Sequence, residues 1–214
     1  MKYKILIFDF DGTLADTTTG IVRTYQETFR SMGYPVPSEE TVKGTIGLTL
    51  TDGFKAGVKG LTDEKAEEAA VIYRRIFPDI AIPCTVAYPG IVRTLEILHG
   101  KGYRLAVATS RSHHSLETLA DKIGVSQFFF KLYGAEDVKN HKPAPDLAEL
   151  ILKESGMSAE DALVVGDATY DLLMGKGAGC RVCGVTWGNQ SREKLMTASP
   201  DYIIDSIEEL LDIV

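Results

Sequence analysis

The 214-residue chain has no apolar run long enough to cross a membrane. A spanning helix requires about 20 consecutive apolar residues, and the polar start of the chain, residues 1–4, leads into a short apolar run that ends at an acid. The pattern predicts a cytoplasmic protein without a membrane partner.

Cysteine is also scarce, with three residues, Cys84, Cys180 and Cys183. An odd and sparse set excludes a dense disulfide framework and favours a reducing compartment. Cys180 and Cys183 have the spacing of half a zinc or redox motif, but they lack a second pair and lie in a β-like run. We therefore interpret them as structural.

Basic residues are fewer than acidic ones: the chain has 23 Lys and Arg residues and 30 Asp and Glu residues, for a net charge of −7. This balance disfavours nucleic acid and anionic membrane surfaces as partners. We expect a small-molecule partner instead. An anionic one remains compatible with the charge, since a metal ion and a few cations can reverse the field inside one pocket.

What the chain does contain is an alternation of short apolar runs with segments of helical spacing. The runs are typical of buried strands and lie at 5–8, 105–108, 128–133, 163–165, 182–185 and 202–204. The helical segments include 91–98, 116–123, 147–152 and 172–178. This order predicts an α/β fold, a doubly wound parallel sheet covered by helices on both faces.

One long interval, 16–84, breaks the alternation. It has helical patterns, clearest at 21–32 and 64–77, and almost no strand candidate. The simplest interpretation is an all-helical domain inserted after the first strand. The predicted α/β core then consists of residues 1–15 and 85–214.

Two acids, Asp9 and Asp11, follow the first predicted strand in the segment Asp-Phe-Asp-Gly-Thr-Leu. Alternate residues of an extended chain point the same way, so the two carboxylates are expected to crowd one spot. Such crowding costs free energy unless a cation or a shared proton relieves it, and Gly12 permits a sharp exit. A solvated turn is an equally good interpretation of this motif alone.

A second acidic cluster follows the predicted strand 163–165, where Gly166 leads into Asp167 and Asp171 lies four residues later. Open α/β sheets place their ligands at the carboxyl ends of strands, so two strands can aim acids at one point. The four aspartates would supply the hard oxygen ligands that suit Mg²⁺. The spacing does not fit a calcium-binding EF-hand loop.

Other strand ends suit a phosphoryl group. Thr109 and Ser110 follow the run 105–108, so a hydroxyl and backbone N–H groups could grip phosphate oxygens there. Lys142, in the segment His-Lys-Pro-Ala-Pro-Asp, could offer a positive charge to both a nucleophile and a phosphate. Each also has an ordinary interpretation, a helix cap for the Thr-Ser pair and a surface position for the lysine.

Asp-x-Asp, then Thr, then Lys, then Gly-Asp, each at a strand end, resembles the phosphatase branch of the haloacid dehalogenase superfamily over the whole chain. The resemblance implies that Asp9 attacks phosphorus and that Asp11 protonates the leaving oxygen and later activates water. The true dehalogenases of the superfamily lack an acid at the second position, so Asp11 disfavours that activity.

The same resemblance assigns the other residues. It implies that Thr109, Lys142, Gly12 and Ser110 contact the phosphate, the last through its backbone. It also implies that Asp167 ligates Mg²⁺, together with the first two aspartates, and that Asp171 supports the metal directly or through water.

By the same likeness, the helical insert is a cap that closes over the pocket and sets substrate choice. Segment 44–50 resembles the substrate-facing loop of phosphoglycolate phosphatases and related pyrophosphatases, with a glycine-bearing helix connection as the alternative interpretation. The predicted activity is therefore Mg²⁺-dependent hydrolysis of a small phosphorylated metabolite.

Several alternatives stay open. A phosphomutase of the β-phosphoglucomutase type or an inorganic pyrophosphatase would use the same aspartates. A receiver domain also phosphorylates an aspartate, but after a later strand, and a non-catalytic binding protein would not need every one of these residues. Of the remaining residues, we expect His113 and His114 in the first turn of a helix, with an approach to the pocket as the alternative. We expect Arg111 to be exposed, with a contact to substrate as the alternative, and Trp187 to lie near the sheet edge.

Overall fold

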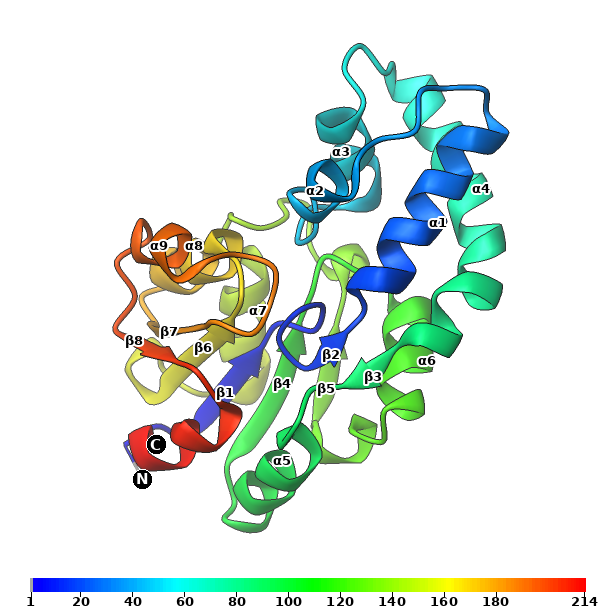
Figure 1. The fold of residues 1–214 in the computed structure, drawn as a ribbon. Coiled ribbons are helices and arrows are strands. Elements are labelled where there is room, and N and C mark those ends of the chain that lie inside the picture. The colour runs from blue at the N-terminus through cyan, green and yellow to red at the C-terminus, as the bar shows by residue number, and fades with distance from the viewer. Residues whose placement is uncertain (1) are drawn as a thin grey trace.

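The computed structural model describes residues 2–214 and has the predicted α/β class (Figure 1). Its centre is a six-stranded sheet in which every pairing is parallel. In order across the sheet, the strands are β5 (Lys131–Tyr133), β4 (Arg104–Ala108), β1 (Ile5–Phe8), β6 (Ala162–Gly166), β7 (Arg181–Val185) and β8 (Tyr202–Ile204). Phe8 lies beside Val107 of β4 and Val165 of β6, so the three central strands end at nearly the same level.

Helices cover both faces of this sheet. The buried side chains of β1 alternate between two apolar clusters, Leu6 and Phe8 in one and Ile5 and Ile7 in the other. The first cluster receives α5 (Ile91–Gly100), α6 (His113–Lys122) and α10 (Leu210–Ile213), and the second receives α7 (Asp146–Ser155), α8 (Thr169–Gly177) and α9 (Arg192–Met196). Each such side chain stabilises the fold by about 1.5–3 kcal/mol, so the alternation fixes the register of the strand. Within residues 2–214, none of the helices combines the length and the apolar character that crossing a membrane demands.

Four further helices form a cap beside the carboxyl ends of the strands (Figure 1). They are α1 (Thr18–Ser31), α2 (Glu39–Lys43), α3 (Leu50–Gly57) and α4 (Asp63–Ile80). The chain enters and leaves the cap through two short antiparallel strands, β2 (Ala15–Asp16) and β3 (Val86–Ala87). Both connections between the cap and the sheet therefore pass through one small ribbon. The division at residues 16 and 85 stays a prediction.

The cap has its own aromatic centre around Phe54. The ring centroids of Tyr25 and Phe29 lie 4.8 and 5.3 Å from that of Phe54, both in edge-on contacts, and Tyr73 of α4 lies 5.8 Å away. The Tyr25 hydroxyl donates a hydrogen bond of 2.9 Å to the carbonyl oxygen of Gly53. These contacts join α1, α3 and α4, so the cap helices are held as one unit.

The predicted strand 128–133 is wrong in its first half. Only Lys131–Tyr133 pair with β4, whereas Ser126–Phe128 form a short 3₁₀ helix. The N–H groups of Phe128 and Phe129 donate to carbonyls three residues earlier, so they are not available to a sheet. The other 3₁₀ helices are Ile82–Cys84, Ala135–Asp137, Ala159–Asp161 and Ile207–Glu209.

Cys180 and Cys183 are both buried, and they belong to the apolar clusters on opposite faces of the sheet. Two thiols on opposite faces cannot ligate one ion or form one disulfide. The geometry therefore agrees with the structural interpretation of this pair.

Candidate active site

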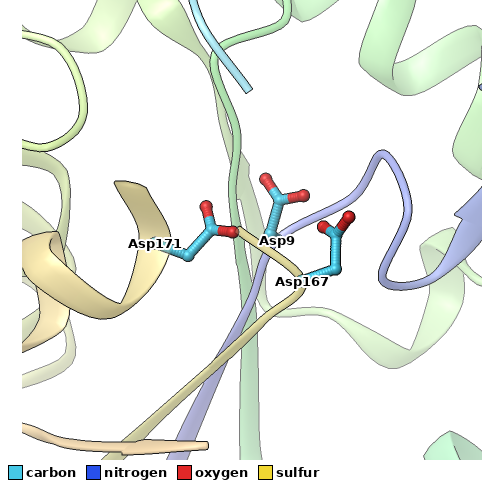
Figure 2. Close-up of side chains that lie close together, drawn as sticks. All are labelled: Asp9, Asp167 and Asp171. Atoms are coloured by element: carbon cyan, nitrogen blue, oxygen red, sulfur yellow. The ribbon is translucent and has the colours of Figure 1, made fainter. Parts of the chain in front are cut away.

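Three buried carboxylates meet where β1 and β6 end (Figure 2). Asp9 follows β1, Asp167 follows β6, and Asp171 lies in the first turn of α8. One carboxylate oxygen from each lies within 4.8 Å of the others. Buried like charges repel one another unless a cation compensates them. Hard oxygen donors in this number suit a divalent metal ion, so the residues fit such an ion.

Lys142 contacts this cluster from the loop before α7. Its Nζ atom donates hydrogen bonds of 2.6 Å to Asp9 Oδ1 and to Asp171 Oδ1, and its side chain is fully buried. Burial alone would lower the pKa of Lys142, but the charges of Asp171 and Asp9 outweigh burial and raise it. The lysine is therefore a fixed positive charge beside Asp9, as the sequence predicts.

The surroundings of Asp9 and Asp167 disfavour the ionised form of each carboxyl group. Burial, and then the charge of Asp171, raise the pKa of Asp9 well above its ordinary range, against the opposing effect of Lys142. The same two causes raise the pKa of Asp167 to about 7, although hydrogen bonds from Asn189 oppose them. A bound cation would lower the pKa of both residues, because it favours the ionised form of each.

The Asp167 carboxylate is held by a cradle of neighbouring groups. Its Oδ1 accepts a hydrogen bond of 3.1 Å from Thr13, and its Oδ2 accepts bonds of 2.7 and 3.0 Å from the backbone and side chain of Asn189. Gly12 has a φ of +86°, as its predicted turn requires, and a Cβ there would lie 2.2 Å from Asp167 Oδ2. A Cβ at Gly188 would lie 2.3 Å from Asp167 Cβ. Both glycines are therefore needed for the close approach of the chain.

Asn189 is a residue that the sequence analysis missed. It follows β7, the strand next to β6, by four residues. The rule that located the aspartates, polar residues just after a strand of a parallel sheet, would have located it as well.

Thr109 and Ser110 lie just after β4, and both line the cavity described below. Thr109 is buried, its N–H donates to the Tyr133 carbonyl at 3.1 Å, and its Oγ1 accepts from the Arg111 N–H at 3.3 Å. Ser110 Oγ donates a bond of 2.7 Å to the Gly47 carbonyl in the cap. Thr109 is thus fixed at the strand end, whereas the Ser110 side chain ties the core to the cap.

Arg111 corrects a prediction, because it is not exposed. Its side chain is 9% exposed and binds the Asp11 carboxylate at two points, Nε to Oδ2 at 3.0 Å and Nη2 to Oδ1 at 2.5 Å. Thr17 Oγ1 adds a third hydrogen bond of 2.6 Å to Asp11. The chain turns inward after β4, where the Arg111 carbonyl accepts from the Ala135 N–H at 2.9 Å. In the structure, the Asp11 carboxylate is therefore paired with Arg111 and does not belong to the three-carboxylate cluster.

The position of Asp11 has a local cause. The strand β1 ends at Phe8, and the N–H groups of Leu14 and Ala15 both donate to the Phe10 carbonyl, which closes a tight turn. The alternation that would place Asp11 beside Asp9 holds only in an extended chain. A direct contact of the Asp11 carboxylate with a metal stays a prediction.

The other residues singled out in the sequence have ordinary positions. His113 begins α6, as predicted, and its Nε2 lies 2.8 Å from an Asp137 carboxylate oxygen. His114 is exposed and lines the cavity. Trp187 Nε1 donates a bond of 3.0 Å to the Thr13 carbonyl, which links the loop after β7 to the loop after β1.

A cavity of about 920 Å³ lies between the strand ends and the cap. Its core side includes Asp9, Asp11 and 109–112, and its cap side includes residues 45–53 and parts of α4. The predicted substrate-facing loop thus lines the cavity over residues 45–50. The cavity is large enough for a small metabolite and opens onto the nucleophile candidate.

The geometry agrees with the comparisons with known proteins. The family profile described as haloacid dehalogenase-like hydrolase matches residues 6–185. The chain belongs to this haloacid dehalogenase family. The probable phosphatase IndB of Dickeya dadantii is 36% identical over 210 residues, which cover 97% of this chain and 91% of the relative.

Other relatives of this haloacid dehalogenase-family enzyme differ in the substrate that they are named for. The pyrophosphatase PpaX of Halalkalibacterium halodurans is 30% identical and covers 100% of this chain and 98% of its own length. A phosphoglycolate phosphatase of Vibrio parahaemolyticus is 28% identical, with 99% and 96% covered. A haloacid dehalogenase-like family hydrolase of Streptococcus pneumoniae has the same fold, with a TM-score of 0.87, 28% identity and coverage of 99% and 98%. The resemblance to the phosphatase branch of the family is therefore confirmed, and the protein is a hydrolase of that branch.

Proposed function

We propose that this enzyme hydrolyses the phosphate monoester of a small metabolite, with Mg²⁺ as its metal and a covalent aspartyl-phosphate at Asp9 as its intermediate. The observation that carries the proposal is the position of Asp9 at the cavity, with Lys142 on one carboxylate oxygen. Among residues 2–214, only Lys142 donates a hydrogen bond to this carboxylate, so the second oxygen is available to attack.

Asp9 and Asp167 would hold the Mg²⁺ ion, and Asp171 would support it from the start of α8. When bound, the ion supplies positive charge that lets an anionic carboxylate approach an anionic phosphate. Magnesium is preferred to softer metals because all the available donors are carboxylate oxygens.

The reaction has two steps. An Asp9 oxygen attacks phosphorus, the bond from phosphorus to the ester oxygen breaks, and that oxygen takes a proton from Asp11. Water then attacks phosphorus and returns a proton to Asp11, and inorganic phosphate leaves as the bond to Asp9 breaks. General acid and base help of this kind contributes about 10²- to 10⁴-fold in rate.

The phosphate would be held by groups at the same strand ends. Lys142 provides the fixed charge, and Thr109, just after β4, lines the cavity. The backbone N–H of Ser110 would complete the grip, since neutral dipoles fixed in place stabilise developing charge without reorganising. The Gly12 N–H already donates to the Ala15 carbonyl at 2.9 Å, so Gly12 would contribute through its turn rather than through this donor.

Two substrate classes are supported by the relatives. A phosphoglycolate phosphatase and the pyrophosphatase PpaX both match nearly the whole chain. We propose the monoester as the primary substrate. Inorganic pyrophosphate is the second candidate, because the pyrophosphatase PpaX is 30% identical to this chain.

The decisive experiment is a release assay for inorganic phosphate with a set of small phosphate monoesters and with pyrophosphate. We expect turnover of a monoester with Mg²⁺ and loss of turnover with EDTA. Turnover of pyrophosphate alone would replace the monoester with the second candidate. No turnover of either class with Mg²⁺ would contradict both.

A further inference from the structure

The cavity is larger than a phosphate group requires. Its volume of about 920 Å³ lies near the upper end of the range of about 300–1,000 Å³ that is typical of pockets for drug-sized ligands. A phosphate held at Asp9 and Thr109 occupies only the part beside the strand ends. The chemistry of the remaining wall therefore indicates what the leaving group of the substrate is made of.

Two apolar residues of the cap loop, Ile46 and Leu48, line the cavity and belong to neither of the two apolar clusters of the fold. Ile46 is 8% exposed, and Leu48 is half-buried. They flank Gly47, whose carbonyl oxygen accepts the hydrogen bond from Ser110 Oγ, so the loop is tied to the core one residue after Thr109. Their apolar surface is therefore available to a ligand close to the phosphate grip, where the leaving group of a bound ester begins.

Helix α4 contributes an aromatic wall, which consists of Tyr73 and Phe77. These residues lie about one turn apart on the helix, their ring centroids are 5.5 Å apart, and both line the cavity. The Phe77 ring also lies 5.1 Å from the guanidinium carbon of Arg111. Because Arg111 follows Thr109 by two residues, the aromatic wall is also close to the phosphate grip.

The charges of the cavity disfavour a second anionic group on the substrate. The guanidinium group of Arg111 binds Asp11 at two points and donates to Ser115 Oγ at 2.8 Å, so its hydrogen-bonding capacity is used on three sides. Beyond Asp9 and Asp11, the acids that line the cavity are Asp52, Glu67 and Glu136. Among residues 2–214, Arg74 is the one other Lys or Arg residue of the wall, and it is exposed. An anionic leaving group would therefore meet more negative than positive charge, and an uncharged one would not be penalised.

We propose that the leaving group of the substrate is uncharged and largely apolar, with the size of a single ring or more, and that the cap loop 46–48 and the aromatic wall of α4 enclose it. The inference rests on the proposed function and deepens it, because it names the chemical class of the alcohol in the ester. This class differs from the substrates that two relatives are named for, since phosphoglycolate and pyrophosphate both carry a second anion.

The test compares 2-phenylethyl phosphate, ethyl phosphate and 2-phosphoglycolate as substrates of the wild-type enzyme with Mg²⁺. The first two esters release primary alcohols, so the ring is the main difference between them. We expect kcat/KM to favour 2-phenylethyl phosphate over ethyl phosphate by about 10- to 10²-fold, because the ring buries apolar area in the cavity. Most of this difference should lie in KM, since the same contacts are made in the ground state and in the transition state. For 2-phosphoglycolate, kcat/KM should not exceed the value for ethyl phosphate.

Leu48→Asn replaces an apolar side chain of the cap loop with a polar one of similar shape. It should reduce the preference for 2-phenylethyl phosphate over ethyl phosphate by about three- to tenfold, because part of the ring then packs against an amide. Leu48 lies outside both apolar clusters, so the variant should keep the fold and the unfolding temperature of the wild type.

Val36→Asn is the matched control. Val36 is an exposed apolar residue of the cap that does not line the cavity, so this variant should keep the wild-type preference. An equal loss of preference in both variants, or no loss in Leu48→Asn, would contradict the role of the cap loop.

Binding can be measured without turnover by using the phosphonate analogues of the two esters, in which a methylene group replaces the ester oxygen. Calorimetric titration of the wild-type enzyme with Mg²⁺ present should show tighter binding of the 2-phenylethyl analogue. Its heat-capacity change should also be more negative, because more apolar surface is buried. Equal affinities and equal heat-capacity changes would overturn the inference.

The outcomes distinguish failure of the inference from failure of the proposed function. Turnover of ethyl phosphate with no preference for the 2-phenylethyl ester would overturn the inference and leave the proposed function intact. A higher kcat/KM for 2-phosphoglycolate or pyrophosphate than for 2-phenylethyl phosphate would also overturn it, because the cavity would then bind a second anion favourably. No turnover of any ester would contradict the proposed function, and the phosphonate titrations would still decide whether the cavity binds an apolar group.

Discussion

Asp9 and Lys142 are separated by 133 positions in the chain, and a carboxylate oxygen of the first lies 2.6 Å from the ammonium nitrogen of the second. Both side chains are nearly inaccessible to solvent, so neither charge is compensated by water. Removing the lysine would leave buried carboxylates without their cation, which lowers the free energy of unfolding. This relationship connects the chemistry of the site to the stability of the protein.

Asp9→Asn should abolish turnover, by at least about 10³-fold in kcat, because the amide keeps the shape of the side chain and removes the nucleophile. The measurement is release of inorganic phosphate with Mg²⁺. The circular dichroism spectrum and the thermal unfolding temperature should stay close to those of the wild type, because Lys142 keeps Asp171 as its counter-ion and an amide oxygen can still accept its hydrogen bond. Turnover at the wild-type rate would rule out Asp9 as the nucleophile.

Lys142→Ala should lower the free energy of unfolding by about 3–5 kcal/mol, because it leaves Asp9 and Asp171 without their shared cation. Urea unfolding of the metal-free protein measures this effect. Lys139→Ala provides the matched control, since Lys139 is exposed in the same loop and should change stability by less than about 0.5 kcal/mol. Equal effects of the two variants would contradict the prediction.

Gly12→Ala should remove Mg²⁺-dependent activity, because the new Cβ would lie 2.2 Å from Asp167 Oδ2 and displace that carboxylate. Gly33→Ala is the matched control, since Gly33 also has a positive φ, of +73°, and nothing lies within 4 Å of its Cβ position. Both variants should lose about 1–2 kcal/mol of stability from the left-handed backbone. Activity that survives in Gly12→Ala would show that the close approach to Asp167 is not required.

Added Mg²⁺ should raise the unfolding temperature more at pH 8 than at pH 5.5. Folding raises the pKa of Asp167 from 3.8 to about 7, so the stability that protonated Asp167 contributes is full below pH 3.8 and is lost as the pH rises through 7. The ionised carboxylate, which predominates at pH 8, is the form that binds a cation.

The magnitude of this effect follows from the size of the protein. Each 1 kcal/mol of extra stabilisation should raise the unfolding temperature by about 2–4 °C for a chain of this length. Differential scanning fluorimetry of dialysed protein with and without Mg²⁺ measures the difference at each pH. Asp167→Asn should remove most of it, and an equal Mg²⁺ effect at both pH values in the wild type would contradict the assignment.

Most of the fold could be predicted from the sequence because its signals are local. The runs at 5–8 and 163–165 are apolar on every residue, which is typical of strands buried on both faces of a parallel sheet. The start of the strand in the run 128–133 was predicted wrongly. An apolar run does not show where backbone hydrogen bonding to a neighbouring strand begins. That boundary depends on pairing with β4, which is distant in the chain.

The sequence by itself determined the alternation of strands and helices that predicts a parallel sheet, with Asp9 and Asp167 each just after a strand. The order of the strands across the sheet was decided by the tertiary structure. Only the tertiary structure decided the partner of Asp11, because the turn at 11–14 ends the alternation and Arg111 is 100 residues away. Periodicity specifies which way a side chain points only while the backbone stays regular. Beyond the last residue of a strand, the contacts of a side chain are set by loops that meet only in the folded chain.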